Sequence, residues 1–135
     1  MIRVTCSVSR IQLCDPMDCS LPCSSVRGMF NMLHCIEAAG YIGIKHAVIH
    51  PKGDHRDSHE NYDKELTRNI EYMTPYVEQA EKYGVKLAFE NMRSPLEAEG
   101  FHRNFSTADE LIPLADHFGH GICWDFGHAH TTSIP

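Results

Sequence analysis

The sequence has no apolar run that approaches the roughly 18–20 residues of a membrane-spanning helix, so no membrane association is expected. Its N-terminus lacks the charged and apolar regions of a secretory signal peptide, which favours a cytoplasmic location. It also lacks a basic cluster: its 12 lysines and arginines are scattered, and the net charge is −6. Because an acidic chain is repelled by phosphate backbones, nucleic acid is not an expected partner.

Cysteine is concentrated near the N-terminus, where four of the six cysteines fall within the first 23 residues. The spacing Cys14-x4-Cys19-x3-Cys23 is not a standard zinc pairing, and no histidine lies among these cysteines. We interpret residues 1–28 as an irregular Cys- and Ser-rich segment with reduced thiols. Its stretch QLCDPMDCSLPCSSVRG resembles the translation of a short interspersed repeat, which suggests a segment foreign to the domain at 29–135.

From residue 29 onward, helical and strand patterns alternate. Apolar spacings of three and four predict helices at 29–39, 62–83 and 107–118. Short apolar runs predict buried strands at 44–50, 85–90 and 120–125. The buried stripe expected on the second helix is Tyr62, Leu66, Ile70, Met73, Val77 and Ala80. The repeated helix–strand order predicts an α/β fold of parallel strands joined by right-handed crossovers.

Local signals predict where the helices begin and end. Gly40 is the expected C-cap of the first helix. Pro75 predicts either a kink in the second helix or a new start with Thr74 as N-cap. Thr107 and Glu110 have the spacing of a capping box at the start of the third helix.

Residues capable of metal binding follow the predicted strands. The three strands end at His50, Glu90 and Asp125, and the carboxyl ends of parallel strands share one edge of the sheet. Two carboxylates and an imidazole suit a divalent cation such as Mn, Mg, Co or Zn. His128 follows as a further ligand or substrate contact, and Asn91 offers an amide that could orient a carboxylate or a hydroxyl group.

Each of these residues also has a plain structural interpretation. A single acid at a strand end is commonly an exposed loop residue or a helix cap. A single histidine such as His128 is a surface residue about as often as it is a ligand. His130 follows in an exposed turn and is the weaker candidate. The coincidence of three such residues on consecutive strands favours a shared site.

Three stretches carry a resemblance to a known family. AVIHP (47–51), GVKLAFENM (84–92) and GICWDFGHAH (121–130) resemble, in order, successive strands of the sugar phosphate isomerase/epimerase family. That family has the xylose isomerase-like TIM barrel, which is shared with endonuclease IV-type enzymes. The resemblance covers about residues 29–135 and implies a partial barrel: about three βα units, strands three to five, of an eight-fold (β/α) barrel.

The resemblance also implies roles for individual residues. Glu90 and Asp125 fall on metal-ligand positions, and His50 matches a histidine that binds metal in the endonuclease branch. His128 falls on the histidine of the D-x-x-H signature, which contacts substrate or metal. Beside these positions, Asn91 and His130 are candidate substrate contacts from their places after the strand ends, not from the resemblance. The implied reaction is proton transfer through an enediolate, in which a carboxylate acts beside a metal-bound carbonyl of a sugar or sugar phosphate. Glu90 and His128 are the candidate catalytic residues.

The departures from the family pattern keep alternatives open. The later-strand histidine and glutamate ligands would lie beyond Pro135, and the second acid–base carboxylate is missing. We therefore expect an incomplete isomerase or epimerase domain, with open sheet edges that favour self-association. The alternatives are a truncated or chimaeric fragment without enzymatic activity and, less favoured because of the acidic charge, an abasic-site endonuclease.

Overall fold

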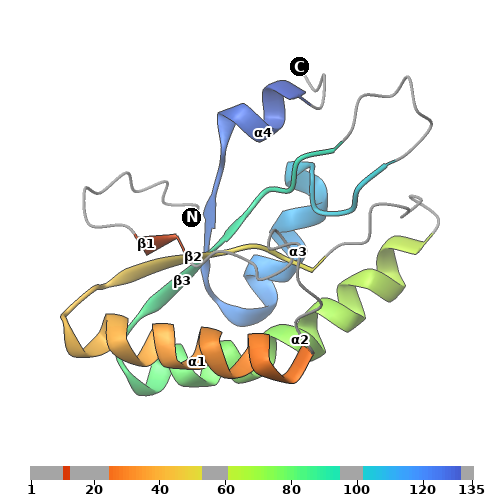
Figure 1. Ribbon diagram of the computed structural model, residues 1–135. Helices are drawn as coiled ribbons and strands as arrows, with labels where there is room; N and C mark the ends of the chain where they lie inside the picture. The colour runs from red at the N-terminus through yellow and green to blue at the C-terminus, as the bar shows by residue number, and fades with distance from the viewer. Residues whose placement is uncertain (1–10, 13–24, 53–60, 95–101, 132–135) are drawn as a thin grey trace.

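The computed structural model describes residues 11–12, 25–52, 61–94 and 102–131. Strands and helices alternate along the chain (Figure 1). The strands are β1 (Ile11–Gln12), β2 (His46–Ile49), β3 (Lys86–Glu90) and β4 (Gly121–Cys123). The helices are α1 (Ser25–Tyr41), α2 (Tyr62–Lys82), α3 (Ala108–Phe118) and α4 (Phe126–Thr131).

The strands form one open parallel sheet in the order β1-β2-β3-β4. Each strand therefore lies beside its neighbour in the sequence, as in a (β/α) barrel. The predicted fold class, part of such a barrel with parallel strands, is confirmed. The sequence predicted three strands; the short β1 is a further one and falls in the segment expected to be irregular.

The core lies on one face of this sheet, where α1, α2 and α3 pack. Because side chains alternate along a strand, Leu87 and Phe89 share a face with Ala47 and Ile49, and all four belong to the buried cluster. A fully buried Leu or Phe contributes roughly 1.5–3 kcal/mol to stability. Glu90 follows Phe89 and therefore points to the opposite face, away from these helices.

Gly40 has a different role from the predicted one. Helix α1 continues to Tyr41, so Gly40 is not its C-cap, and the left-handed turn falls at Gly43, with φ +80°. A Cβ atom at Gly40 would lie 2.5 Å from the Cβ of Tyr83, which follows α2. Glycine is therefore needed here because α1 and the end of α2 approach closely.

Helix α2 differs from its predicted pattern in two ways. It runs through Pro75 without interruption, so a new start with Thr74 as N-cap is wrong; the Thr74 hydroxyl donates to the Ile70 carbonyl instead (2.7 Å). In its first half the buried positions are Glu65 and Asn69, whereas Tyr62, Leu66 and Ile70 are only partly buried. The remaining buried positions are Met73, Tyr76, Val77 and Ala80, three of which were predicted.

Helix α3 has the predicted ends. The side chains and backbone of Thr107 and Glu110 form a capping box, and Gly119 closes the helix in the left-handed conformation with φ 63°. Immediately before this helix, Phe105 adopts φ 66° and is fully buried.

Within the described part of the chain, no helix is both long and apolar enough to cross a membrane. The N-terminal cysteines up to Cys23 lie outside the described residues. The proposed boundary at residue 28 remains a prediction, although α1 begins before it, at Ser25.

Candidate metal centre

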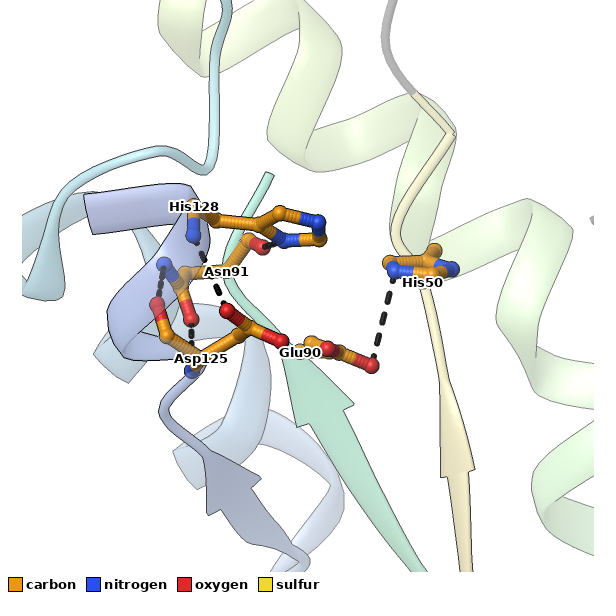
Figure 2. A network of polar contacts seen from close by, with 5 residues as sticks. All are labelled: His50, Glu90, Asn91, Asp125 and His128. Atoms are coloured by element: carbon orange, nitrogen blue, oxygen red, sulfur yellow. Dashed lines mark hydrogen bonds and ion pairs between the residues drawn. The ribbon is translucent and has the colours of Figure 1, made fainter. Parts of the chain in front are cut away.

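The carboxyl edge of the sheet brings His50 and Glu90 together. Ile49 pairs with Phe89 in the register of β2 and β3. The residues that follow them, His50 and Glu90, therefore also lie side by side. Their closest side-chain atoms, His50 Nε2 and Glu90 Oε2, are 3.4 Å apart (Figure 2). Glu90 is only 1% exposed, so its carboxylate sits in a largely water-free environment beside the imidazole.

Helix α4 adds His128 to this pair. The ligand atoms of His50, Glu90 and His128 all lie within 4.8 Å of one another, and the two imidazole centroids are 5.9 Å apart. His50 directly follows β2, Glu90 ends β3 and His128 lies in α4, and the three side chains converge on one point (Figure 2). Two imidazoles and a carboxylate at this separation form a donor set suited to a transition metal or zinc.

The short helix α4 is positioned by Asp125. Its Oδ1 accepts a hydrogen bond from the His128 backbone N–H (2.9 Å), so Asp125 caps the helix. A Cβ atom at Gly127 would lie 3.0 Å from this oxygen, which explains the glycine between the two residues. The structural interpretation of Asp125 as a helix cap therefore holds, and it is the cap that directs His128 toward the site.

The orientation of the His128 ring determines which nitrogen can bind a ligand. Its Nδ1 lies 2.7 Å from the backbone carbonyl oxygen of Asn91. A carbonyl oxygen only accepts, so Nδ1 carries the proton and donates. In the neutral imidazole, Nε2 then keeps its lone pair, which is the arrangement found in histidines that bind metals.

Asp125 also meets the Glu90 side chain. The hydrogen bond from the His128 backbone is the largest cause that lowers the pKa of Asp125; burial opposes it, while the His128 charge and a hydrogen bond with Glu90 lower the pKa further. Two carboxyl groups in contact repel each other when both are ionised, unless a proton or a cation lies between them. Asp125 is thus next to the three-residue group, although it is not one of its members.

Both polar atoms of the Asn91 side chain form hydrogen bonds with the backbone of Asp125. Its Oδ1 accepts from the Asp125 N–H (2.5 Å) and its Nδ2 donates to the Asp125 carbonyl (3.1 Å). His130 is exposed in the last turn of α4. The prediction that Asn91 and His130 contact a substrate stays a prediction.

The sequence analysis missed a second acid–imidazole pair and a buried amide. His102 Nε2 and Glu110 Oε1 lie 2.5 Å apart beside the start of α3. Asn69, in α2, hydrogen-bonds to both backbone polar groups of Lys52, two residues after His50. The one signal for Asn69 was its polar side chain beside the predicted apolar stripe.

Comparison with known protein families identifies a related family. The profile of a family described as xylose isomerase-like TIM barrel matches residues 17–134. Neither a curated protein nor a solved structure matches the chain.

Proposed function

Because the chain belongs to the xylose isomerase-like TIM barrel family, we propose that it forms part of a metal-dependent sugar or sugar-phosphate isomerase or epimerase. The observation that supports this function is the convergence of His50, Glu90 and His128 at the carboxyl edge of the sheet. In barrels of this type the active site lies at that edge. The proposal adds to family membership a specific site and a reaction class.

The residues present fit a divalent cation. His50, Glu90 and His128 would hold it, and the Asp125 carboxylate beside Glu90 would supply further negative charge. The donor set of imidazole nitrogens and carboxylate oxygens is compatible with Zn, Co or Mn, whereas Mg favours oxygen ligands alone. The protonated Nδ1 of His128 leaves its other nitrogen for the cation.

The proposed reaction is proton transfer at a carbon next to a carbonyl. A bound cation would supply Lewis acidity, which makes that C–H group acidic. Glu90, buried beside His50, would remove and return the proton through the carboxylate oxygen that does not hold the cation. His128 would orient the substrate hydroxyl group or help to hold the cation.

The described residues supply four parallel strands, whereas a closed barrel of this type has eight. We therefore attribute to this chain the metal-holding part of the site, and we propose that further strands complete the substrate pocket. Self-association through the open sheet edges is one source of such strands. A cytoplasmic location and the lack of nucleic-acid binding also stay predictions.

The test has two stages. Calorimetric titration with Mn²⁺, Co²⁺ and Zn²⁺ should detect one site per chain, which Glu90→Gln removes and Glu110→Gln retains. The loaded protein is then incubated in D₂O with aldoses, ketoses and their phosphates, and NMR detects deuterium at the carbon next to the carbonyl.

The two stages separate two failures. Equal affinity of the wild type and Glu90→Gln would contradict the metal site. Metal binding without deuterium incorporation into any of these sugars would show that this chain, alone or self-associated, does not perform the proposed reaction.

A further inference from the structure

Asn91 lies at the centre of the contacts that join the end of β3 to the start of α4. Its side chain is fully buried, and it directly follows Glu90 in the sequence. Its amide binds the N–H and the carbonyl of Asp125, and its own carbonyl accepts from Nδ1 of His128. Asn91 is thus connected to Glu90 along the chain and to Asp125 and His128 through hydrogen bonds (Figure 2).

The amide of Asn91 continues the strand pairing beyond the sheet. Regular pairing of β3 with β4 ends at Glu90 and Cys123. Beyond that point two hydrogen bonds between the Asn91 side chain and the Asp125 backbone, one in each direction, take the place of backbone-to-backbone bonds. The backbone can therefore leave β4 and enter α4 while Asp125 stays held beside the end of β3.

From this geometry we propose that Asn91 is a positioning residue of the metal site. It fixes the Asp125 backbone, so that the Asp125 carboxylate caps α4 and the His128 ring reaches the Asn91 carbonyl. That contact keeps the proton on Nδ1 and presents Nε2 to the cation. The inference rests on the proposed metal site but concerns the arrangement of its ligands, which can be measured without metal.

Asn69 provides a matched control in the same molecule. It is also a buried asparagine, 1% exposed. Its Oδ1 accepts from the Lys52 N–H (2.7 Å), and its Nδ2 donates to the Lys52 carbonyl (2.8 Å). Asn69 therefore makes the same pair of bonds to a loop backbone, but none of the bonds found for it reaches a proposed ligand.

The experiment compares Asn91→Ala with Asn69→Ala in the full chain. Calorimetric titration with Zn²⁺ should show about a 10–100-fold loss of affinity for Asn91→Ala and less than a threefold change for Asn69→Ala, since partners of metal ligands typically have effects of this size. Thermal unfolding should show similar losses of stability for the two variants. Asn91→Ser, which can keep one of the two bonds, replaces Asn91→Ala if that variant does not fold.

A second readout needs no metal. In the metal-free wild type and in Asn69→Ala, ¹⁵N chemical shifts of the imidazoles should show His128 with its proton on Nδ1. In the Asn91 variant the same ring should show both tautomers. An unchanged tautomer, an affinity within threefold of the wild type, or an equal loss of affinity in Asn69→Ala would overturn the inference.

The two readouts also separate this inference from the proposed function. A wild type that binds no Zn²⁺ contradicts the proposed function, whereas the tautomer still tests the positioning by Asn91.

Discussion

The molecule contains two glutamate–histidine pairs with different surroundings. His102 and Glu110 lie 2.5 Å apart, and the second oxygen of Glu110 accepts from the Thr107 backbone N–H in the capping box of α3. His50 and Glu90 lie 3.4 Å apart at the carboxyl edge of the sheet. The first pair has the closer contact, yet the second is the better candidate for a functional site.

The difference lies in what surrounds each glutamate. Both oxygens of Glu110 have local partners: one meets the His102 ring, and the other accepts from the Thr107 N–H in the capping box that begins α3. Glu90 instead meets the Asp125 carboxyl group and lies near a second imidazole, that of His128. A helix cap needs only a single acceptor, whereas two carboxyl groups and two imidazoles held together are typical of a cation site. The surroundings of an acid–imidazole pair therefore indicate function better than its separation does.

The largest expected difference between the pairs is in stability with metal present. A cation that binds only the folded state adds about 2.7 kcal/mol to the free energy of unfolding when the free ion is at roughly 100 times Kd. We expect this gain in the wild type and in Glu110→Gln, because glutamine at this position can still cap α3. We expect no gain in Glu90→Gln. Urea unfolding with and without Zn²⁺ measures this gain in stability. An equal gain in all three proteins would contradict the assignment of the metal site to Glu90.

Without metal we expect a smaller difference in stability, in which Glu110 contributes more than Glu90. Glu110→Ala removes the bonds to Thr107 and His102, and loss of such a cap should cost about 1–2 kcal/mol. Glu90→Gln should cost less stability than Glu110→Ala, because its amide can donate to Asp125 where two carboxyl groups met. Urea unfolding in a chelator compares the two variants. A larger loss for Glu90→Gln would assign it a structural role.

The site's arrangement was only partly predictable from the sequence. Apolar runs mark the strand ends, and these runs can be recognised from local sequence. Parallel pairing of the strands then places His50 and Glu90 side by side. Helix α4 was not predicted, since a helix of six residues leaves almost no periodic signal. Its position depends on the cap at Asp125, and the sequence analysis left open whether Asp125 was a cap or a ligand.

Other features were hidden because they depend on packing between distant segments. Gly40 has the sequence signature of a C-cap, but Tyr83, far along the chain, is what requires a glycine there. Asn69 interrupts the apolar stripe of α2, because its partner is the Lys52 backbone rather than the core. Polar side chains that bind a loop backbone are invisible to an analysis based on hydrophobic periodicity.

The smallest expected effect concerns Tyr62, whose hydroxyl donates to the Glu110 carbonyl (2.7 Å). Burial, followed by the charges of Glu110 and Asp63, raises the pKa of Tyr62 to about 12. Since the folded pKa lies above the unfolded value of about 10, its contribution to stability is fully present below pH ~10 and lost as the pH rises toward about 12. The difference in tyrosinate absorbance between the wild type and Tyr62→Phe measures this ionisation.

Glu110→Gln should lower the pKa of Tyr62 only partly, because burial is the largest cause of the shift. Ionisation of Tyr62 near pH 10 in the folded wild type would contradict the burial seen around it.

The central claim, that the metal centre is at the sheet edge and not at the start of α3, is tested most directly by a Zn²⁺ titration followed by imidazole ¹H–¹⁵N NMR. The account predicts large saturable shifts of the His50 and His128 rings, with the His102 ring unchanged. Shifts of His102 equal to those of His50, or the absence of any shift of His50 and His128 at saturating Zn²⁺, would contradict it.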